Sequence, residues 1–157
     1  MIEVANPSAL QDLVGTHLGS SDWVLIDQPA IDRFAAATGD HNWYHVDVAR
    51  AARDMPGGKT IAHGLLLQAL VPALTAGMVL IQHRGRALNY GADKVRYLTP
   101  VQAGDRVRLH VSLKSAEMRA NGMLMNRLCS MEIEGTDKPA MVGDFLTLVA
   151  SEPEAGP

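Results

Sequence analysis

The spacing of apolar and polar residues divides the chain into a helical first half and a strand-rich second half. In "QPAIDRFAAATGD" the apolar residues recur at helical spacing, with Pro29 at the start and Gly39 at the end, which is the usual punctuation of a helix. In "DRVRLHVSLK" apolar and polar residues alternate, which predicts a strand with one face toward solvent. We therefore expect helices to precede strands along the chain.

Weaker signals predict three further elements in the first half. The stretch "NPSALQDLVGTHLG" suits a short helix, with Asn6 or Ser8 as N-cap and Gly15 as the stop. β-Branched and aromatic residues favour a strand over about residues 22–26. The stretch "VDVARAARDM" predicts another short helix, capped by Asp47.

The most apolar stretch is "LLLQALVPALTAGMVLI", residues 65–81. A helix that is apolar on nearly every side is either buried or spans a membrane. Gln68, Pro72 and Thr75 interrupt the stretch, and its charge-free length is at the lower limit for a span. We therefore predict a long buried central helix and no membrane segment.

The second half has the pattern of an antiparallel meander. Asn121-Gly122 predicts a hairpin, "GTDK" predicts another turn, and Gly91 marks a bulge or close approach within the strand "RALNYGADKVRYL". At least four strands wrapped around the apolar helix give an α+β domain. We expect one domain over residues 1–157, with an ordered core at about 5–150 and a flexible tail "SEPEAGP".

Composition narrows the functional classes. The chain has 157 residues and a net charge of −3, which suits one domain and gives no basic surface for nucleic acid. The start "MIEVANPSAL" lacks a basic segment followed by an apolar core, so no signal peptide is expected. The single cysteine, Cys129, cannot form an internal disulfide and is expected to be a small buried residue. These features predict a cytoplasmic protein.

Candidate chemistry is concentrated in "GDHNWYH", residues 39–45. A carboxylate and an imidazole that share a water, as Asp40 and His45 would here, can remove its proton. Asn42 offers a donor and an acceptor that can orient either group. The alternative is an ordinary turn, because loops are rich in aspartate, asparagine and glycine for conformational reasons.

A further candidate is His63-Gly64, immediately before the apolar stretch. The first amides of a helix are unpaired donors at the positive end of its dipole, and glycine lets a ligand approach closely. The Gly64 amide would polarise a bound carbonyl oxygen. His63 is expected to be packed and hydrogen-bonded beside the helix start, and with Asn42 it is assigned to binding or orienting the substrate.

A metal site is an alternative for the same polar residues. His41 and His45 have a spacing that can share a metal on a helix, with Asp40 beside them. Gly39 and Asn42 favour a loop instead, no cysteine joins the group, and no HExxH motif is present. We therefore expect no metal.

These motifs resemble those of a known family. "FAAATGDHNWYHVD" followed by "TIAHGLLLQAL" is similar to the MaoC-like dehydratases, the (R)-specific enoyl-CoA hydratases of the hot-dog fold. Asp40, Asn42, His45 and Asp47 match the family motif, while Trp43 stands where the family often has proline. The later stretch "NYGADKVRYLTPVQAGDRVRL" also matches the family at Tyr97, Pro100, Val101, Gly104 and Asp105.

The resemblance, which covers about residues 20–150, implies a function. Asp40 and His45 would hold the water that adds across the double bond of a trans-2-enoyl thioester, giving an (R)-3-hydroxyacyl product. The Gly64 amide would bind the thioester oxygen, and no cofactor is needed because CoA is part of the substrate. The resemblance also implies homodimers whose two sheets join, which would cover an exposed edge strand.

The apolar helix would then border the acyl chain. Pro72, in its interior, is expected to bend the axis and open a slot between helix and sheet. The small residues Ala73, Ala76 and Gly77 would widen the slot, and flexible Met78 would adapt to its contents. A tight core helix with a harmless bend is the alternative.

Two other functions remain as alternatives. A hot-dog acyl-CoA thioesterase would hydrolyse the thioester, and fold alone does not separate hydrolysis from hydration. A non-catalytic acyl-thioester-binding or lipid-binding protein is the other, although a binder has no use for the Asp40–His45 pair.

Overall fold

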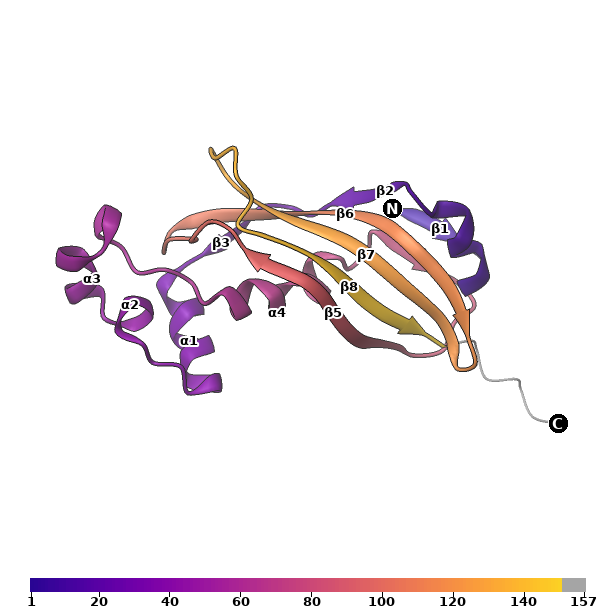
Figure 1. The fold of residues 1–157 in the computed structure, drawn as a ribbon, viewed down its shortest axis with the longest axis horizontal. Coiled ribbons are helices and arrows are strands. Elements are labelled where there is room, and N and C mark those ends of the chain that lie inside the picture. The colour runs from indigo at the N-terminus through magenta and orange to yellow at the C-terminus, as the bar shows by residue number, and fades with distance from the viewer. Residues whose placement is uncertain (151–157) are drawn as a thin grey trace.

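The structure, a computed structural model, describes residues 1–150 of the chain. The tail predicted to be flexible, residues 151–157, lies outside the described residues. A long curved sheet lies over one helix, α4, and the helices α1, α2 and α3 lie beyond one end of the sheet (Figure 1).

Among residues 1–150, six strands form the main sheet, in the order β2-β6-β7-β8-β5, with β3 pairing to the same strand as β2. Every pairing in this sheet is antiparallel. The predicted alternation places Val107, Leu109 and Val111 on the buried face. The strands are β2 (His17–Ser20), β3 (Val24–Ile26), β5 (Ala87–Tyr97), β6 (Asp105–Arg119), β7 (Gly122–Ile133) and β8 (Met141–Val149).

Two predicted irregularities of the sheet are present. The register of β5 against β8 shifts between Asn89 and Gly91, at the predicted place. β6 and β7 form the predicted hairpin, in which Arg119 pairs with Gly122. Gly122 has a φ of 132°, and a Cβ there would collide with the carbonyl oxygen of Val149, so the position requires glycine.

The helices of the first half begin and end at their capping residues. α1 (Gln28–Thr38) follows Asp27, whose carboxylate accepts a hydrogen bond from the backbone of the first turn, and it ends at left-handed Gly39. Asp47 caps α3 (Val48–Asp54) in the same way. These boundaries confirm the predicted helices.

Three short elements differ from the expectation. The predicted N-terminal helix, η1 (Pro7–Leu13), is a 3₁₀ helix capped by Asn6, and a second 3₁₀ turn, η2 (Pro56–Gly58), follows α3. The segment around the candidate aspartate and histidine, expected to be a loop, contains one helical turn, α2 (Trp43–Val46). A single turn is too short to carry a periodic apolar pattern, so the sequence gives no helical signal there.

The apolar helix is shorter than predicted. α4 spans Gly64–Leu74, and the rest of the stretch forms a turn and then strand β4 (Val79–Ile81), which pairs in parallel with β1 (Ile2–Val4). Pro72 removes a backbone donor two residues before the helix ends, and Gly77 has a φ of 79°, outside the helical region. The expected bend within one continuous helix is therefore wrong, because the helix stops.

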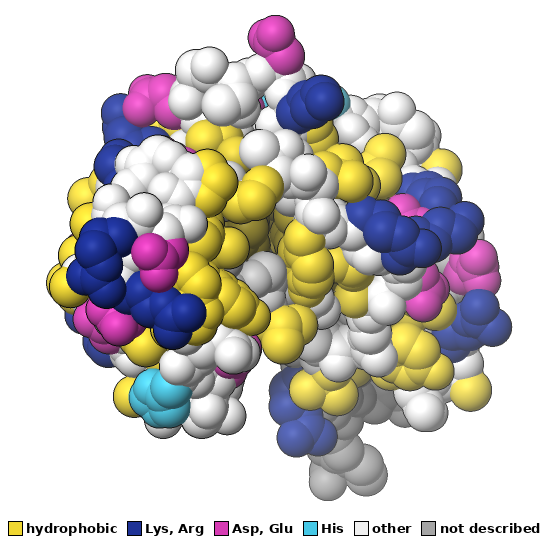
Figure 2. Space-filling view, turned by 60° about the vertical axis from the view of Figure 1, so that its left-hand side comes forward, with side chains coloured by type: hydrophobic (Ala, Val, Ile, Leu, Met, Phe, Trp, Pro, Cys, Tyr) yellow, Lys and Arg dark blue, Asp and Glu magenta, His cyan; other side chains and the backbone are white. Residues whose placement is uncertain are grey.

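α4 packs against the sheet through one side only. Leu66, Leu67 and Val71 belong to the buried core, whereas Leu65 is 60 % exposed. The expectation of a helix buried on every side is therefore wrong, because the sheet covers only part of it. Figure 2 shows hydrophobic side chains gathered around a hollow on one face of the molecule. No helix within residues 1–150 is long and apolar enough to cross a membrane.

Candidate active site

Three polar side chains from separate segments meet at the start of α4. Asp40 follows the glycine that ends α1, His45 lies in α2, and His63 immediately precedes α4. One ligand-capable atom of each lies within 4.8 Å of the others. The structure thus brings the predicted pair, Asp40 and His45, together and adds His63 to them.

The hydrogen bonds of His45 fix which of its nitrogens is free. The ring is buried, and Nδ1 lies 2.6 Å from the carbonyl oxygen of Ile61. A carbonyl oxygen only accepts, so Nδ1 carries the proton and, in the neutral ring, Nε2 keeps its lone pair. Nε2 of His45 is therefore available as a base.

The pKa of His45 lies below its ordinary value. Burial is the largest cause, and the neighbouring His63 ring adds to it; together they outweigh the Ile61 hydrogen bond and the Asp40 carboxylate, which both favour the protonated ring. The ring is therefore neutral at neutral pH, the state in which it can accept a proton.

Two residues that the sequence did not single out hold His45 in place through its backbone. The side-chain amide of Gln28, at the start of α1, donates to the carbonyl oxygen of His45 over 2.8 Å. The hydroxyl of buried Thr60 donates to the side-chain oxygen of the same glutamine. Both contacts join residues far apart in the chain, so no local pattern signals them.

Asp40 is partly exposed and accepts hydrogen bonds from Asn42. The Asn42 side-chain nitrogen lies 2.6 Å from Asp40 Oδ1, and its backbone nitrogen lies 3.4 Å away. Slight burial raises the pKa of Asp40, but these bonds and the two nearby histidines outweigh it, so the pKa lies below its ordinary value. The carboxylate is therefore ionised at neutral pH, and Asn42 is in contact with the group it was expected to orient.

His63 is packed and hydrogen-bonded, as the sequence predicted. It is 3 % exposed, and its Nε2 donates to the backbone carbonyl oxygen of Asp40 over 2.9 Å. Its ring stacks on that of His45, with centroids 3.7 Å apart and 24° between the planes. The centroid of the Phe34 ring lies 5.0 Å from the centroid of the His63 ring. His63 therefore fixes both the backbone of Asp40 and the plane of His45.

The residues that come together differ from the metal set considered from the sequence. His41 does not join the cluster; Asp40, His45 and His63 do. His45 Nδ1 and His63 Nε2 already face carbonyl oxygens, so only one ring nitrogen of each histidine is left for a metal. Asp40, His45 and His63 would then supply three of the four ligands that a tetrahedral zinc site needs.

Gly64 is the first residue of α4, so its amide has no acceptor within the helix. A Cβ at this position would lie 2.8 Å from Cγ of the Tyr97 ring. The tyrosine hydroxyl donates to the side-chain oxygen of Gln68 over 2.7 Å, which ties the ring to α4. The missing side chain at Gly64 therefore makes room for Tyr97, and the amide remains available to a ligand.

Pockets lie along α4 and the turn that follows it. One, of about 530 Å³, begins at Leu65 and reaches Pro72, and a second, of about 490 Å³, continues from Pro72 to Met78. A third, of about 370 Å³, lies at the end of the helix and shares Met78 with the second. The hollows therefore adjoin one another from the first turn of α4 to the turn that follows it.

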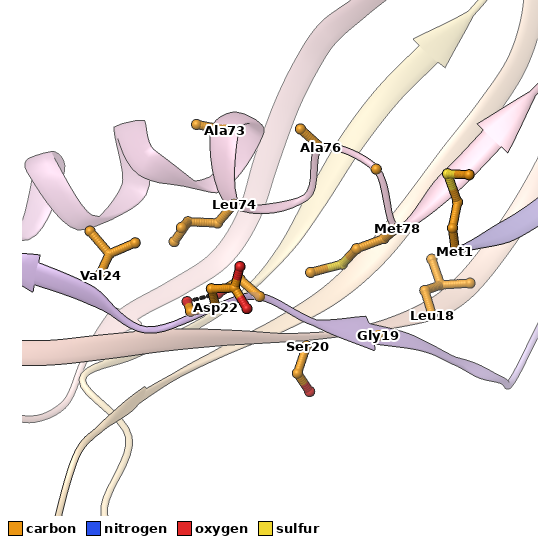
Figure 3. A pocket seen from close by; sticks show the side chains of 12 residues that line it. Met1, Leu18, Gly19, Ser20, Asp22, Val24, Ala73, Leu74, Ala76 and Met78 are labelled. Atoms are coloured by element: carbon orange, nitrogen blue, oxygen red, sulfur yellow. Dashed lines mark hydrogen bonds between the residues drawn. The ribbon is translucent and has the colours of Figure 1, made fainter.

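The third pocket is lined by all four residues expected to form the slot, Ala73, Ala76, Gly77 and Met78. Figure 3 shows Ala73, Ala76 and Met78 bordering it on one side and Leu18 and Gly19 of β2 on the other. The location of the predicted slot is therefore confirmed. Its origin is different, because the helix ends there instead of bending.

A curved antiparallel sheet packed against one central helix is the hot-dog fold. The R-hydratase PhaJ1 from Pseudomonas aeruginosa, in its unliganded form, shares this fold, with a TM-score of 0.70 over 88 % of this chain and 82 % of that chain. The two sequences are 24 % identical, so this likeness concerns the fold.

Sequence comparisons identify the family, within this fold, to which the chain belongs. Residues 9–128 match the family described as MaoC like domain. Nodulation protein N of Rhizobium leguminosarum bv. viciae is 40 % identical over 92 % of this chain and 91 % of its own length. The 3-hydroxyacyl-thioester dehydratase Z of Mycobacterium tuberculosis (strain ATCC 25618 / H37Rv) is 45 % identical over 84 % of this chain and 87 % of its own length. The chain belongs to the MaoC-like dehydratase family of acyl-thioester hydratases and dehydratases.

Proposed function

We propose that this protein adds water across the double bond of trans-2-enoyl-CoA thioesters to give (R)-3-hydroxyacyl-CoA, and catalyses the reverse dehydration. One observation carries the proposal. A carboxylate oxygen of the ionised Asp40 and a ring nitrogen of the neutral His45 lie within 4.8 Å of one another, a separation that a single water can bridge.

In this mechanism the pair activates the water. Asp40 accepts a hydrogen bond from the water and orients it, while Nε2 of His45 takes one of its protons. The oxygen bonds to C3 of the enoyl group, the double bond shifts toward C1, and a proton is returned to C2. The net change is the addition of one water, and no proton is gained or lost overall.

The start of α4 would stabilise the negative charge that builds on the thioester oxygen during this addition. The Gly64 amide is an unpaired donor at the positive end of the helix dipole. A donor placed in advance at the site of developing charge lowers the barrier without reorganisation. The acyl chain would then run along α4, where the adjoining pockets lie.

Relatives support the substrate class and the stereochemistry. One relative, at 45 % identity, carries the name 3-hydroxyacyl-thioester dehydratase Z. Dehydration of a 3-hydroxyacyl thioester is the reverse of the proposed hydration. A structural neighbour, PhaJ1, is named an R-hydratase.

We further expect the protein to act as a homodimer. β5 is the outer strand of the sheet next to β8, and Leu88 and Tyr90 on it are 56 % and 66 % exposed. Leu65 of α4 is also exposed. An uncovered edge with large apolar side chains favours pairing with a second chain. Light scattering of the purified protein should give about twice the chain mass of 16.9 kDa, and the mass of a single chain would contradict the dimer.

The test of the reaction is the loss of ultraviolet absorbance of the conjugated thioester when crotonyl-CoA is mixed with the protein, followed by chiral analysis of the product. Loss of absorbance with an (R)-3-hydroxy product supports the proposal. Release of free CoA would instead indicate a thioesterase. Tight binding of the thioester with no turnover would indicate a non-catalytic binding protein.

A further inference from the structure

Arg127 lies on the face of β7 that is otherwise occupied by buried apolar side chains. Alternate residues of this strand face the core, and Arg127 falls on the same face as the residues two positions before and after it. The others on this face are buried: Met123, Met125, Cys129, Met131 and Ile133. A charged side chain in such a row is costly to bury and calls for a partner.

The partners that Arg127 has are neutral. Nη1 donates to the hydroxyl of Thr75 over 3.0 Å, and Nη2 donates to the hydroxyl of Thr147 over 2.7 Å. Nε is buried and has no hydrogen-bond partner among the described residues. Burial lowers the pKa of Arg127, yet a guanidinium stays protonated in proteins.

Within residues 1–150, no carboxylate lies within ion-pair distance of Arg127. A buried acid does lie on the adjacent strand: Asp144 is 4 % exposed, but it is paired with Lys114 at 2.5 Å. The residues opposite Arg127 in the register are Phe145 on β8 and Leu113 on β6, neither of which is charged. The charge of Arg127 is thus left without a counter-ion among the residues that the structure describes.

Arg127 stands where two of the pockets along α4 adjoin. It lines both the pocket that begins at Leu65 and the one that ends near Met78. The described residues that line these two pockets include no aspartate or glutamate, and the second pocket contains another cation, Arg84. The surroundings are otherwise mainly apolar, so a charged group that entered would meet positive charge only.

We propose that Arg127 binds the carboxylate of a ligand whose apolar chain lies in the pockets along α4. The planar guanidinium matches a carboxylate through two parallel hydrogen bonds, and the apolar lining suits a hydrocarbon chain. The carboxylate belongs either to a free long-chain acid or to the far end of an acyl thioester substrate.

The alternative in which the carboxylate belongs to the substrate rests on the proposed function. If the thioester oxygen lies at the Gly64 amide, the chain enters the pocket at Leu65 and runs toward Pro72. The eight residue steps from Gly64 to Pro72 advance by about 12 Å along the helix axis. A medium-length chain would therefore bring its far end to Arg127, which also borders Pro72 in the pocket lining.

The binding test compares decanoate with decan-1-ol by calorimetry in wild type, in Arg127→Met and in Arg106→Met. Arg106 pairs with Glu134 and serves as the matched control. Wild type and Arg106→Met should prefer decanoate, and Arg127→Met should bind it about tenfold or more weakly, as expected for loss of a charge-assisted hydrogen bond. Replacing a buried charge by an apolar side chain is often neutral or stabilising, so the Tm of Arg127→Met should not fall. If that Tm does fall, the same binding comparison is made with the polar variant Arg127→Gln.

Equal affinity of wild type for the acid and the alcohol, or unchanged affinity of Arg127→Met for decanoate, would overturn the proposal.

A kinetic comparison then separates the two sources of the carboxylate. It uses trans-2-decenoyl-CoA and its analogue with a terminal carboxylate. A higher kcat/KM for the carboxylate-ended substrate, lost in Arg127→Met, assigns the carboxylate to the substrate. Decanoate binding without such a preference assigns it to a separate ligand. Failure of the proposed function itself would appear as no hydration of either thioester, with the calorimetric result unaffected.

Discussion

The imidazole rings of His45 and His63 lie stacked, with centroids 3.7 Å apart and 24° between their planes. The stacked His63 ring is one cause of the lowered pKa of His45. His63 also donates to the backbone of Asp40. One residue therefore links the position of the carboxylate to the protonation state of the base.

This link predicts a pH effect. The base must be neutral, so kcat/KM should fall on the acid side only below the ordinary histidine pKa of 6.5, because the pKa of His45 is lowered. His63→Gln removes a group that lowers this pKa and opens the site to water, so the acid limb should move toward higher pH. His41→Gln, an exposed histidine outside the cluster, is the control and should leave the limb in place. An unchanged limb in His63→Gln would show that His63 serves packing only.

The Gly64 amide can be tested by removing the N–H itself. Proline is well tolerated at the first position of a helix, and the preceding His63 has a ψ of 134°, which suits a residue before proline. Any side chain at Gly64 would collide with Tyr97, so the comparison is made with Tyr97→Ala as background. Gly64→Pro in that background should lose about 10²–10³-fold in kcat relative to Gly64→Ala, as for loss of one oxyanion donor. Equal kcat values for the two double mutants would exclude the amide from the reaction.

The sequence predicted those features that depend on local chemistry. Asp47 caps its helix, Gly39 ends the preceding one, and the hairpin at Gly122 forms, because each depends on nearby residues. The length of α4 was predicted wrongly. Residues 75–81 are as apolar as the helix, and apolar composition alone does not distinguish a turn and a buried strand from a helix.

Only part of the site could be predicted, because some of its contacts join residues that are far apart in the sequence. Asp40 and His45 lie close in sequence, so their pairing could be expected, but the bond from His63 to Asp40 joins residues 23 positions apart. The support of His45 by Gln28 is likewise a tertiary contact. Arg127 did carry a signal, because it interrupts an alternating apolar strand.

The pocket at the end of α4 predicts a chain-length effect. Ala73 lines it with a small side chain, so Ala73→Phe should fill part of its volume. We expect the variant to lose catalytic efficiency for C8 and longer enoyl-CoAs while keeping most of it for C4, because a short chain does not reach this end of the helix. The measurement is kcat/KM across C4, C6, C8 and longer substrates. Equal losses at every length would show that the chain does not run there.

The cluster of Asp40, His45 and His63 is close enough to hold a metal ion, so the absence of a metal requirement is a real prediction. We expect dialysis against EDTA to leave kcat unchanged, because one nitrogen of each histidine already faces a backbone carbonyl oxygen and the proposed reaction needs no metal. Metal analysis of the purified protein should find no stoichiometric zinc. Loss of activity on chelation, with recovery on adding zinc, would contradict this expectation.

The central claim is that Asp40 and His45 act together on one water. Its most direct test is kcat/KM for crotonyl-CoA in wild type, Asp40→Asn, His45→Gln and the double mutant, with Tm measured for each to confirm folding. Each single change should lower the rate by about 10²–10⁴-fold, the usual contribution of a positioned acid or base. Because both groups serve the same water, the double mutant should be little worse than either single one. Near wild-type turnover in either folded single mutant would contradict the account.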